Sequence, residues 1–320
     1  MGFLVPVVLG PHLIKAEPEA PSPDSLITLE RIHDREDFKE KRFNLRWLED
    51  GVRYTFLKAL KEGTYRDQEE IWLATAGKHD QARRLVSAED LVPDGEEKAL
   101  KIDGYTLSPD HSLLLLYTNS KRVWRSNSRG DYWILHRETG ALRQLGGEDA
   151  RPSSLMFAKL SPTGTHVAYV RDRNIHLEAL SDHSIRTLTT SGSRHVFNGR
   201  FDWVYEEELG IRDGFRWSPD GAAIAYWQFD ESGVRQQIML DHVSGRYPKA
   251  TRFGYPKAGQ RNAACRVGVV EISTAKTTWL QVPGDPREHY LARMEWAGRE
   301  NSSELVLQQL NRSQNTKLVL

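Results

Sequence analysis

The 320-residue sequence predicts an all-β fold, a β-propeller, and two observations lead to this prediction. First, a short turn-and-strand pattern recurs, with its second residue at positions 48, 108, 161, 218 and 297. The intervals of 60, 53, 57 and 79 residues suit units of several short strands, as in propeller blades. Second, candidate helices are scarce, and most units contain further strand-like runs.

Each copy of the recurring pattern combines a tight turn with an apolar strand. The best copies are LSPDHSLLLLYT from Leu107, LSPTGTHVAYV from Leu160 and WSPDGAAIAYWQF from Trp217, and weaker copies begin at Trp47 and Trp296. Proline presets φ and glycine supplies a positive φ, so the first part of the pattern forms a turn. The run that follows, as in 223–227, is apolar throughout. Such a run is typical of a strand packed between two neighbouring blades.

Further strands and two helices complete the predicted units. Pairs of strand-like runs are expected at 131–137 with 141–145, at 174–180 with 184–190, and at 265–272 with 276–282. The candidate helices are 34–43 and 202–209, the second with Asp202 as its N-cap. The last interval is about 20 residues longer than the others, and the excess lies between Gln228 and Gly259. We interpret it as an arm that extends from one blade, at about 229–258.

Charge and residue content exclude several classes of function. Lys and Arg total 44 and Asp and Glu total 44, so we expect neither a nucleic-acid partner nor an anionic membrane surface. Cys265 is the only cysteine, which excludes an intramolecular disulfide and a cysteine-rich zinc site. The histidines show no metal-ligand spacing with a nearby carboxylate, so no metal and no cofactor is expected. No apolar run reaches the roughly 18 residues of a membrane-spanning helix.

The first 25 residues are expected to form a tail before the folded part. The segment MGFLVPVVLG is apolar, but it has no preceding positive charge and contains Pro6. It is either a degraded signal peptide or a tail without a targeting role. A proline-rich linker follows over 16–25. The compartment stays unknown, with a periplasmic or secreted location favoured over a cytoplasmic one.

The segment FDWVYEEELG, residues 201–210, places Glu206, Glu207 and Glu208 side by side. An acidic run of this kind is ordinarily a solvated face, and the ten residues alone do not exclude that interpretation. Other segments of the chain favour a functional role for this run. NGRFDWVYEEELG, WSPDGAAIAYWQFD, YPKATRFGYPKAG and VWRSNS together resemble the N-terminal β-propeller of the dipeptidyl peptidase IV family, which are serine exopeptidases of the prolyl oligopeptidase superfamily.

The likeness runs from about Leu26 to Leu320, with the motifs in family order. It implies that 26–320 is an incomplete propeller of about four to five blades out of eight. It also implies an enzyme that releases N-terminal dipeptides after a penultimate Pro or Ala, without cofactor or metal. The family's serine lies in a Gly-x-Ser-x-Gly elbow of a C-terminal α/β-hydrolase domain, and that motif does not occur here. The chain is therefore expected to be truncated before its catalytic domain.

The resemblance assigns roles to individual residues. Glu207 and Glu208 are expected to bind the α-ammonium group of the peptide, because a primary ammonium offers three donors to adjacent carboxylates. Arg125 is expected to contact a substrate carbonyl and help hold the glutamates; the alternative is an ordinary surface arginine. The supporting residues are Asp202, Trp203, Tyr205 and Glu206, and Glu206 either supports the pair or faces solvent.

The sequence allows an alternative interpretation both of the arm and of the overall function. In the family the segment corresponding to 229–258 packs against a second subunit, which implies a homodimer, and the alternative is a long loop. For function, the alternative to the substrate-anchoring part of an exopeptidase is a non-catalytic propeller that binds peptides or proteins. A generic exported propeller of the TolB kind explains the repeats but not DWVYEEE.

Overall fold

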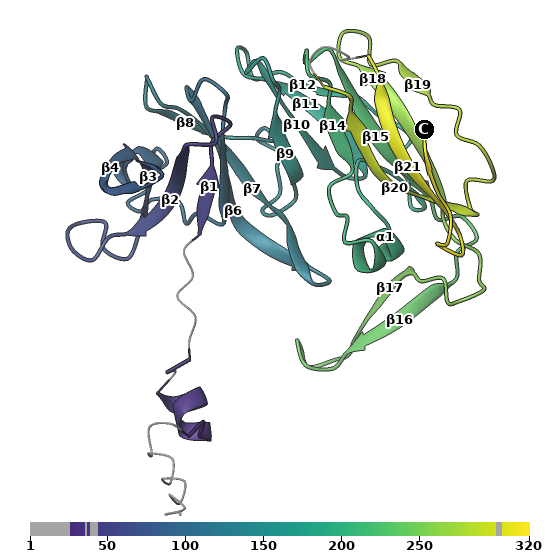
Figure 1. Ribbon diagram of the computed structural model, residues 1–320, viewed down its shortest axis with the longest axis horizontal. Helices are drawn as coiled ribbons and strands as arrows, with labels where there is room; N and C mark the ends of the chain where they lie inside the picture. The colour runs from purple at the N-terminus through teal and green to yellow at the C-terminus, as the bar shows by residue number, and fades with distance from the viewer. Residues whose placement is uncertain (1–25, 36, 39–43, 299–302) are drawn as a thin grey trace, which may run out of the picture. The chain divides into compact units, whose positions relative to one another are not determined.

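The computed structural model of the chain describes residues 26–35, 37–38, 44–298 and 303–320 (Figure 1). The chain divides into two compact units, Met1–Leu45 and Arg46–Leu320. In the first unit, a helical turn spans Glu30–Asp34. The tail 1–25 and most of the helix predicted at 34–43 lie outside the described residues. No helix in the described ranges is long and apolar enough to cross a membrane.

Three four-stranded antiparallel sheets follow one another along the chain, each with its strands in sequence order (Figure 1). The first contains β1 (Leu45–Trp47), β2 (Arg53–Ala59), β3 (Glu69–Thr75) and β4 (Lys78–Val86). The second contains β5 (Gly104–Leu107), β6 (Leu113–Val123), β7 (Ser126–His136) and β8 (Ala141–Gln144). The third contains β9 (Met156–Leu160), β10 (His166–Arg171), β11 (Asn174–Ala179) and β12 (Ile185–Thr187). A 3₁₀ turn at Glu89–Leu91 joins the first two sheets.

The fourth sheet carries the insertions. It contains β13 (Val196–Asn198), β14 (Phe215–Trp217), β15 (Ala223–Asp230), β18 (Ala264–Glu271) and β19 (Thr277–Trp279), and both β13 and β14 pair with β15. Helix α1 (Trp203–Glu208) lies between β13 and β14 in the chain. The fifth sheet contains β20 (His289–Trp296), β21 (Leu305–Asn311) and β22 (Lys317–Val319).

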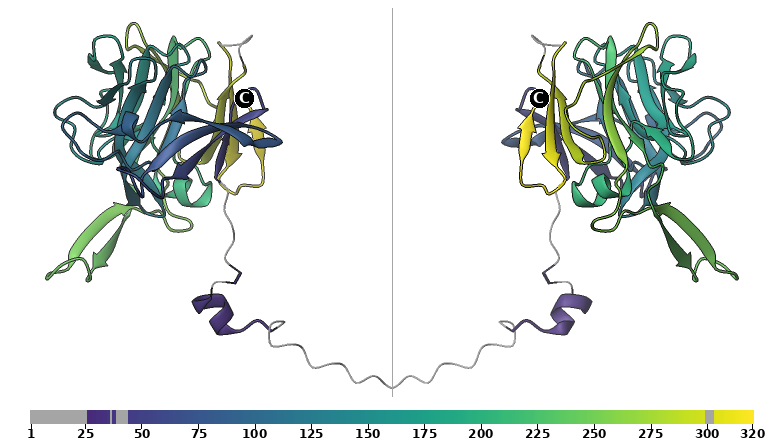
Figure 2. Two further views of the ribbon diagram at one scale, coloured as in Figure 1. Left: turned by 90° about the vertical axis from the view of Figure 1, so that its left-hand side faces the viewer. Right: turned by 90° about the vertical axis from the view of Figure 1, so that its right-hand side faces the viewer.

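The predicted arm is a separate two-stranded hairpin of β16 (Gln236–Asp241) and β17 (Lys249–Gly254). Figure 2 shows it extending away from the blades. The five sheets confirm the predicted propeller blades, and the six strands predicted between 131 and 282 are all present. The weak copy from Trp296 lies partly outside the described residues.

The second strand of a blade is buried on both faces, as its continuous apolar sequence predicts. In β15, Ile224 and Tyr226 pack in one cluster with residues of the third blade. Ala225, Trp227 and Phe229 pack in another cluster with residues of the fifth. Successive side chains of a strand point to opposite faces, so a strand between two blades needs apolar residues at every position.

In the second, third and fourth blades, the recurring turn joins the first and second strands and is held by a buried serine. Ser218 Oγ accepts a hydrogen bond from the Ala223 amide at 2.9 Å and donates to Asp220 at 2.6 Å. Ser108 and Ser161 occupy the same position in their blades, and all three serines are at most 2% exposed. The side chain thereby closes the turn by bonding the first residues of the next strand.

The turns and the insertions lie at opposite ends of the second strands. In β15, Ala223 follows the turn, whereas Asp230 at the other end pairs with Val196 and leads into the arm. In β6, the turn precedes Leu113, and the tip of the β6–β7 hairpin follows Val123. The hairpin tip, α1 and the arm therefore belong to the same end of the blades (Figure 1).

The Ser218→Ala variant tests the role of the turn serine. It leaves the partly buried Ala223 amide without its acceptor, so the free energy of unfolding is expected to fall by about 1 kcal/mol. Urea unfolding followed by circular dichroism measures the change. Ser181→Ala, at an exposed position, is the matched control, and equal stability of the two variants contradicts the prediction.

Candidate functional site

Helix α1 presents the three consecutive glutamates, and local capping sets both of its ends. Asp202 is the predicted N-cap: its Oδ1 accepts a hydrogen bond from the Tyr205 amide at 2.9 Å. Gly210 follows the helix with φ of 65°, a conformation that glycine adopts without strain. The Ile211 amide then donates to the Tyr205 carbonyl at 3.1 Å. The helix is thus limited to six residues.

Tyr205 fixes α1 between the fourth and fifth blades. Its ring lies 4.8 Å from that of Phe229 on β15 and 5.8 Å from that of Tyr290 on β20. The Leu291 amide donates a hydrogen bond to Tyr205 Oη at 2.8 Å. Tyr205 therefore holds α1 against both blades.

The three glutamates have different environments. Glu206 is buried rather than solvent-facing, with Oε1 3.8 Å from Arg212 Nε, and burial raises the pKa of its carboxyl. The Glu207 side chain is 9% exposed, and its Oε2 lies 2.5 Å from Arg125 Nε. Glu208 is exposed, and it has no ion pair within the described residues. One accessible carboxylate thus lies next to one that is already paired.

Arg125 reaches this helix because its hairpin is long. Strands β6 and β7 have 11 residues each, and Val123 pairs with Ser126 at the tip. Trp124 has φ of 53°, which is uncommon for a residue with a side chain. The Arg125 side chain is 78% exposed apart from its contact with Glu207. The structure therefore brings together two of the three predicted binding residues and places Glu208 beside them in sequence.

The base of the arm contacts both parts of the site, which the sequence did not predict. Phe253 on β17 lies 4.4 Å from the Trp124 ring, next to Arg125. Tyr255 lies 4.2 Å from the ring of Trp203, the first residue of α1. The only sequence feature that pointed to these two contacts was the alternation of aromatic residues in RFGY. The end of β17 and the residue that follows it thus contact both the hairpin tip and the helix.

A buried acidic group lies under the start of the helix. Burial raises the pKa of Asp202 to about 7, and the nearby Glu231 carboxylate acts in the same direction. The Tyr205 amide and the Arg200 guanidinium oppose the shift. Asp202 therefore carries a proton in the folded chain at a pH where an exposed aspartate is ionised.

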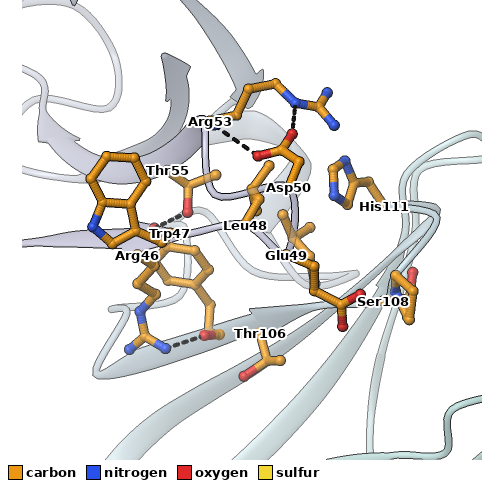
Figure 3. Close-up of a pocket in the computed structure, with 13 residues that line it drawn as sticks. Arg46, Trp47, Leu48, Glu49, Asp50, Arg53, Thr55, Thr106, Ser108 and His111 are labelled. Atoms are coloured by element: carbon orange, nitrogen blue, oxygen red, sulfur yellow. Dashed lines mark hydrogen bonds and ion pairs between the residues drawn. The ribbon is translucent and has the colours of Figure 1, made fainter. Parts of the chain in front are cut away.

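A cavity of about 530 Å³ lies between the first and second blades, away from the helix (Figure 3). The polar groups on its walls bind one another: Tyr105 Oη donates to Thr55 at 2.9 Å, and Arg46 donates to the Tyr105 carbonyl at 2.5 Å. We interpret these contacts as holding the two blades together.

The described part of the chain contains no group of three acidic, histidine or cysteine side chains placed to hold a metal.

The Asp202→Asn variant is expected to change the pH dependence of stability, because asparagine also caps a helix but does not titrate. The folded pKa of Asp202 is raised from 3.8 to about 7. Between these pH values the unfolded chain has released a proton that the folded chain retains, so wild-type stability falls as pH rises. From pH 5 to pH 8 the variant should gain roughly 2 kcal/mol relative to the wild type. Urea unfolding at both pH values measures this difference, and a constant difference contradicts the prediction.

Comparison with known proteins agrees with this architecture. The family model described as the dipeptidyl peptidase IV (DPP IV) N-terminal region matches residues 108–320. Dipeptidyl aminopeptidase B of Saccharomyces cerevisiae is 32% identical over 224 residues, which cover 68% of this chain and 26% of that protein. Prolyl endopeptidase FAP of Mus musculus is 31% identical over 236 residues, covering 72% of this chain and 30% of that protein.

A relative named inactive dipeptidyl peptidase 10, from Rattus norvegicus, is 31% identical over 68% of this chain and 28% of its own length. Among solved structures, Porphyromonas gingivalis dipeptidyl peptidase 4 superposes with a TM-score of 0.79 at 27% identity, covering 92% of this chain and 40% of that one. The chain thus spans well under half the length of these relatives. Its blades, its helix and its sequence show that the chain belongs to the dipeptidyl peptidase IV family.

Proposed function

We propose that the chain holds the amino terminus of the substrate in a dipeptidyl-peptidase-IV-type serine exopeptidase, which releases N-terminal dipeptides with a penultimate Pro or Ala. The observation that carries the proposal is the Arg125–Glu207 ion pair at 2.5 Å next to the exposed Glu208. In this proposal the nucleophile and its acid–base partners come from an α/β-hydrolase domain outside the 320 residues. No cofactor or metal takes part.

The charges around the helix favour a cationic ligand. Glu206, Glu207 and Glu208 end the helix, and its last turn contains no basic residue. The negative end of the helix dipole adds to their repulsion. Arg125 neutralises Glu207, and Arg212 lies beside Glu206. An α-ammonium group between Glu207 and Glu208 would neutralise the remaining charge. Its charge-assisted hydrogen bonds would contribute about 1.5 to 3 kcal/mol each.

Fixing the substrate's amino terminus gives the proposed enzyme its dipeptide product. Two extended residues span roughly 7 Å. A nucleophile held at that distance from Glu207 and Glu208 therefore attacks the second peptide bond. A longer chain with a blocked terminus lacks the ammonium group and is not anchored.

The alternative function, a propeller that binds peptides without cleaving them, has one observation in its favour. A relative that covers 68% of this chain carries the name inactive dipeptidyl peptidase 10. Turnover of an unblocked dipeptide substrate by the full-length protein distinguishes the two functions.

The Glu208→Gln variant tests the anchor directly. Wild-type chain is expected to bind the tetrapeptide Ala-Pro-Ala-Ala and not its N-acetylated form, as measured by isothermal titration calorimetry. Loss of one charge-assisted bond weakens binding by roughly tenfold or more. In the full-length enzyme, Glu207→Ala should largely abolish turnover of unblocked substrates.

The matched control is Glu148→Gln, which removes an exposed carboxylate elsewhere in the chain. Unchanged circular dichroism and thermal midpoint show that Glu208→Gln and Glu207→Ala fold normally. The anchor assignment is wrong if the acetylated and free peptides bind equally, or if Glu208→Gln binds as tightly as Glu148→Gln.

We also propose that the arm joins two copies of the chain. It exposes large apolar side chains toward its tip, with Met239 51%, Leu240 58%, Val243 93% and Tyr247 78% exposed. A two-stranded hairpin is marginally stable alone in water, and an exposed apolar patch is typical of a protein interface. A second copy would cover these side chains.

The Leu240→Asp variant tests this assembly, because an added carboxylate in the interface costs desolvation energy. Size-exclusion chromatography with light scattering should show a dimer for the wild type and a monomer for Leu240→Asp. Val52→Asp introduces the same charge at an exposed position outside the arm and should remain dimeric. A monomeric wild type at high micromolar concentration would contradict the proposal.

A further inference from the structure

Two cavities at the α1 end of the blades form one concave, strongly basic surface. The larger, of about 460 Å³, and the smaller, of about 240 Å³, share Arg173 and Arg200 in their walls. We define the basic groove as these two cavities, with cationic walls formed chiefly by Lys121, Arg129, Arg151, Arg173, Arg194 and Arg200. The residues come from the ends of the second, third and fourth blades.

The groove has more positive than negative charge. Its walls contain three acidic side chains, Asp172, Asp202 and Glu231, of which Asp172 is bound by Arg151 at 3.0 Å and Asp202 has its pKa raised to about 7 by burial. Arg129, Arg173 and Arg200 have no ion pair among the residues that the structure describes. Burial lowers the pKa of Arg200, and repulsion from Arg129 and Arg173 adds to this shift, against Glu231 and Glu206. An anion in the groove would relieve this repulsion.

The two central arginines are held in place. Arg173 lies in the two-residue β10–β11 turn, where Asp172 has φ of 48° and Arg173 has φ of 68°. Glycine is favoured at such positions, so an arginine here costs free energy. The Arg173 carbonyl accepts hydrogen bonds from the amide and the side chain of Asn198, at 3.0 and 3.2 Å. The Arg200 guanidinium lies over the Phe197 ring at 4.9 Å.

The layout of the cations favours a chain with several carboxylates over one small anion. Lys121 and Arg129 are cross-strand neighbours on the hairpin that carries Arg125 at its tip. Strand β6 continues for two residues past Lys121, to Val123, and Arg125 lies in the tip that follows. The two cations are therefore separated by roughly 7 to 10 Å along the hairpin, which is about two to three residues of an extended peptide. The larger cavity has no aromatic side chain in its wall on which nucleic-acid bases could stack, whereas the smaller cavity has five. An oligonucleotide is therefore included in the test.

We propose that the basic groove binds the side-chain carboxylates of an acidic peptide segment. The inference extends the proposed function, from which it takes the peptide as ligand, and names the substrate class: peptides with Asp or Glu a few residues after their amino terminus. The carboxylates bind Arg129, Arg173 and Arg200. The groove does not require the α-ammonium group that Glu207 and Glu208 bind.

The test uses the 320-residue chain and two labelled peptides, acetyl-Ala-Pro-Gly-Glu-Glu-Glu and its Gln-Gln-Gln counterpart, in fluorescence anisotropy. The acetyl group removes the ammonium, so the result is independent of the anchor. The acidic peptide should bind at least about fivefold tighter at low salt, and high salt should remove the difference. Arg173→Gly and Arg129→Gln should each weaken its binding by roughly two- to fivefold.

Arg173→Gly separates binding from folding. Glycine suits the φ of 68° at this position, so the thermal midpoint should stay the same or rise while the affinity falls. Arg83→Gln, at an exposed position on β4, is the control and should bind like the wild type. Arg129→Gln changes an exposed side chain and tests the groove if another variant does not fold.

Equal affinity for the Glu and Gln peptides overturns the proposal, as does unchanged binding by Arg173→Gly and Arg129→Gln. Tighter binding of a labelled oligothymidylate than of the acidic peptide also overturns it. If the Gln peptide with a free amino terminus binds through Glu208 but the Glu peptide gains nothing, the groove fails and the anchor stands. The converse result, acidic preference without an effect of the free terminus, removes the anchor and leaves the groove.

Discussion

The position of the candidate site depends on the hydrogen bond from the Leu291 amide to Tyr205 Oη, buried between the fourth and fifth blades. A helix of six residues is too short to be stable by itself in water. It persists here because Asp202 caps its start and because the Tyr205 ring packs against Phe229 and Tyr290. The direction of the glutamate side chains is therefore set by blade packing. The hairpin tip is held in a similar way, through Trp124 against the base of the arm.

Local sequence patterns predicted the blades, because each turn and each doubly buried strand is specified by a few adjacent residues. Asp202 as N-cap followed from the same kind of local chemistry. The meeting of Arg125 with Glu207 did not, since it depends on the length of the β6–β7 hairpin and the packing of three blades. Family resemblance, not periodicity, singled out those two residues. The burial of Glu206 and the contact of Phe253 with Trp124 escaped prediction because tertiary packing alone decides them.

The charge balance of the chain conceals a separation of charge at one end of the blades. Lys and Arg match Asp and Glu in number, yet the fold gathers three carboxylates at the end of α1 and arginines from three blades in the neighbouring groove. Composition could not reveal this, because residues such as Arg129, Arg173 and Arg200 are far apart in sequence. A peptide with a positive terminus and negative side chains complements both regions at once.

The serine-closed turns have a practical consequence. They lie at the end of the second strands opposite the helix and the hairpin tip, and the eight residues of β15 separate the two ends by roughly 27 Å. This is about three Debye lengths at physiological ionic strength. Fluorophores, tags or a solid support attached near the turns therefore leave the electrostatic field at the other end almost unchanged. The propeller can be immobilised in a single orientation, with its ligand-facing end toward the solution.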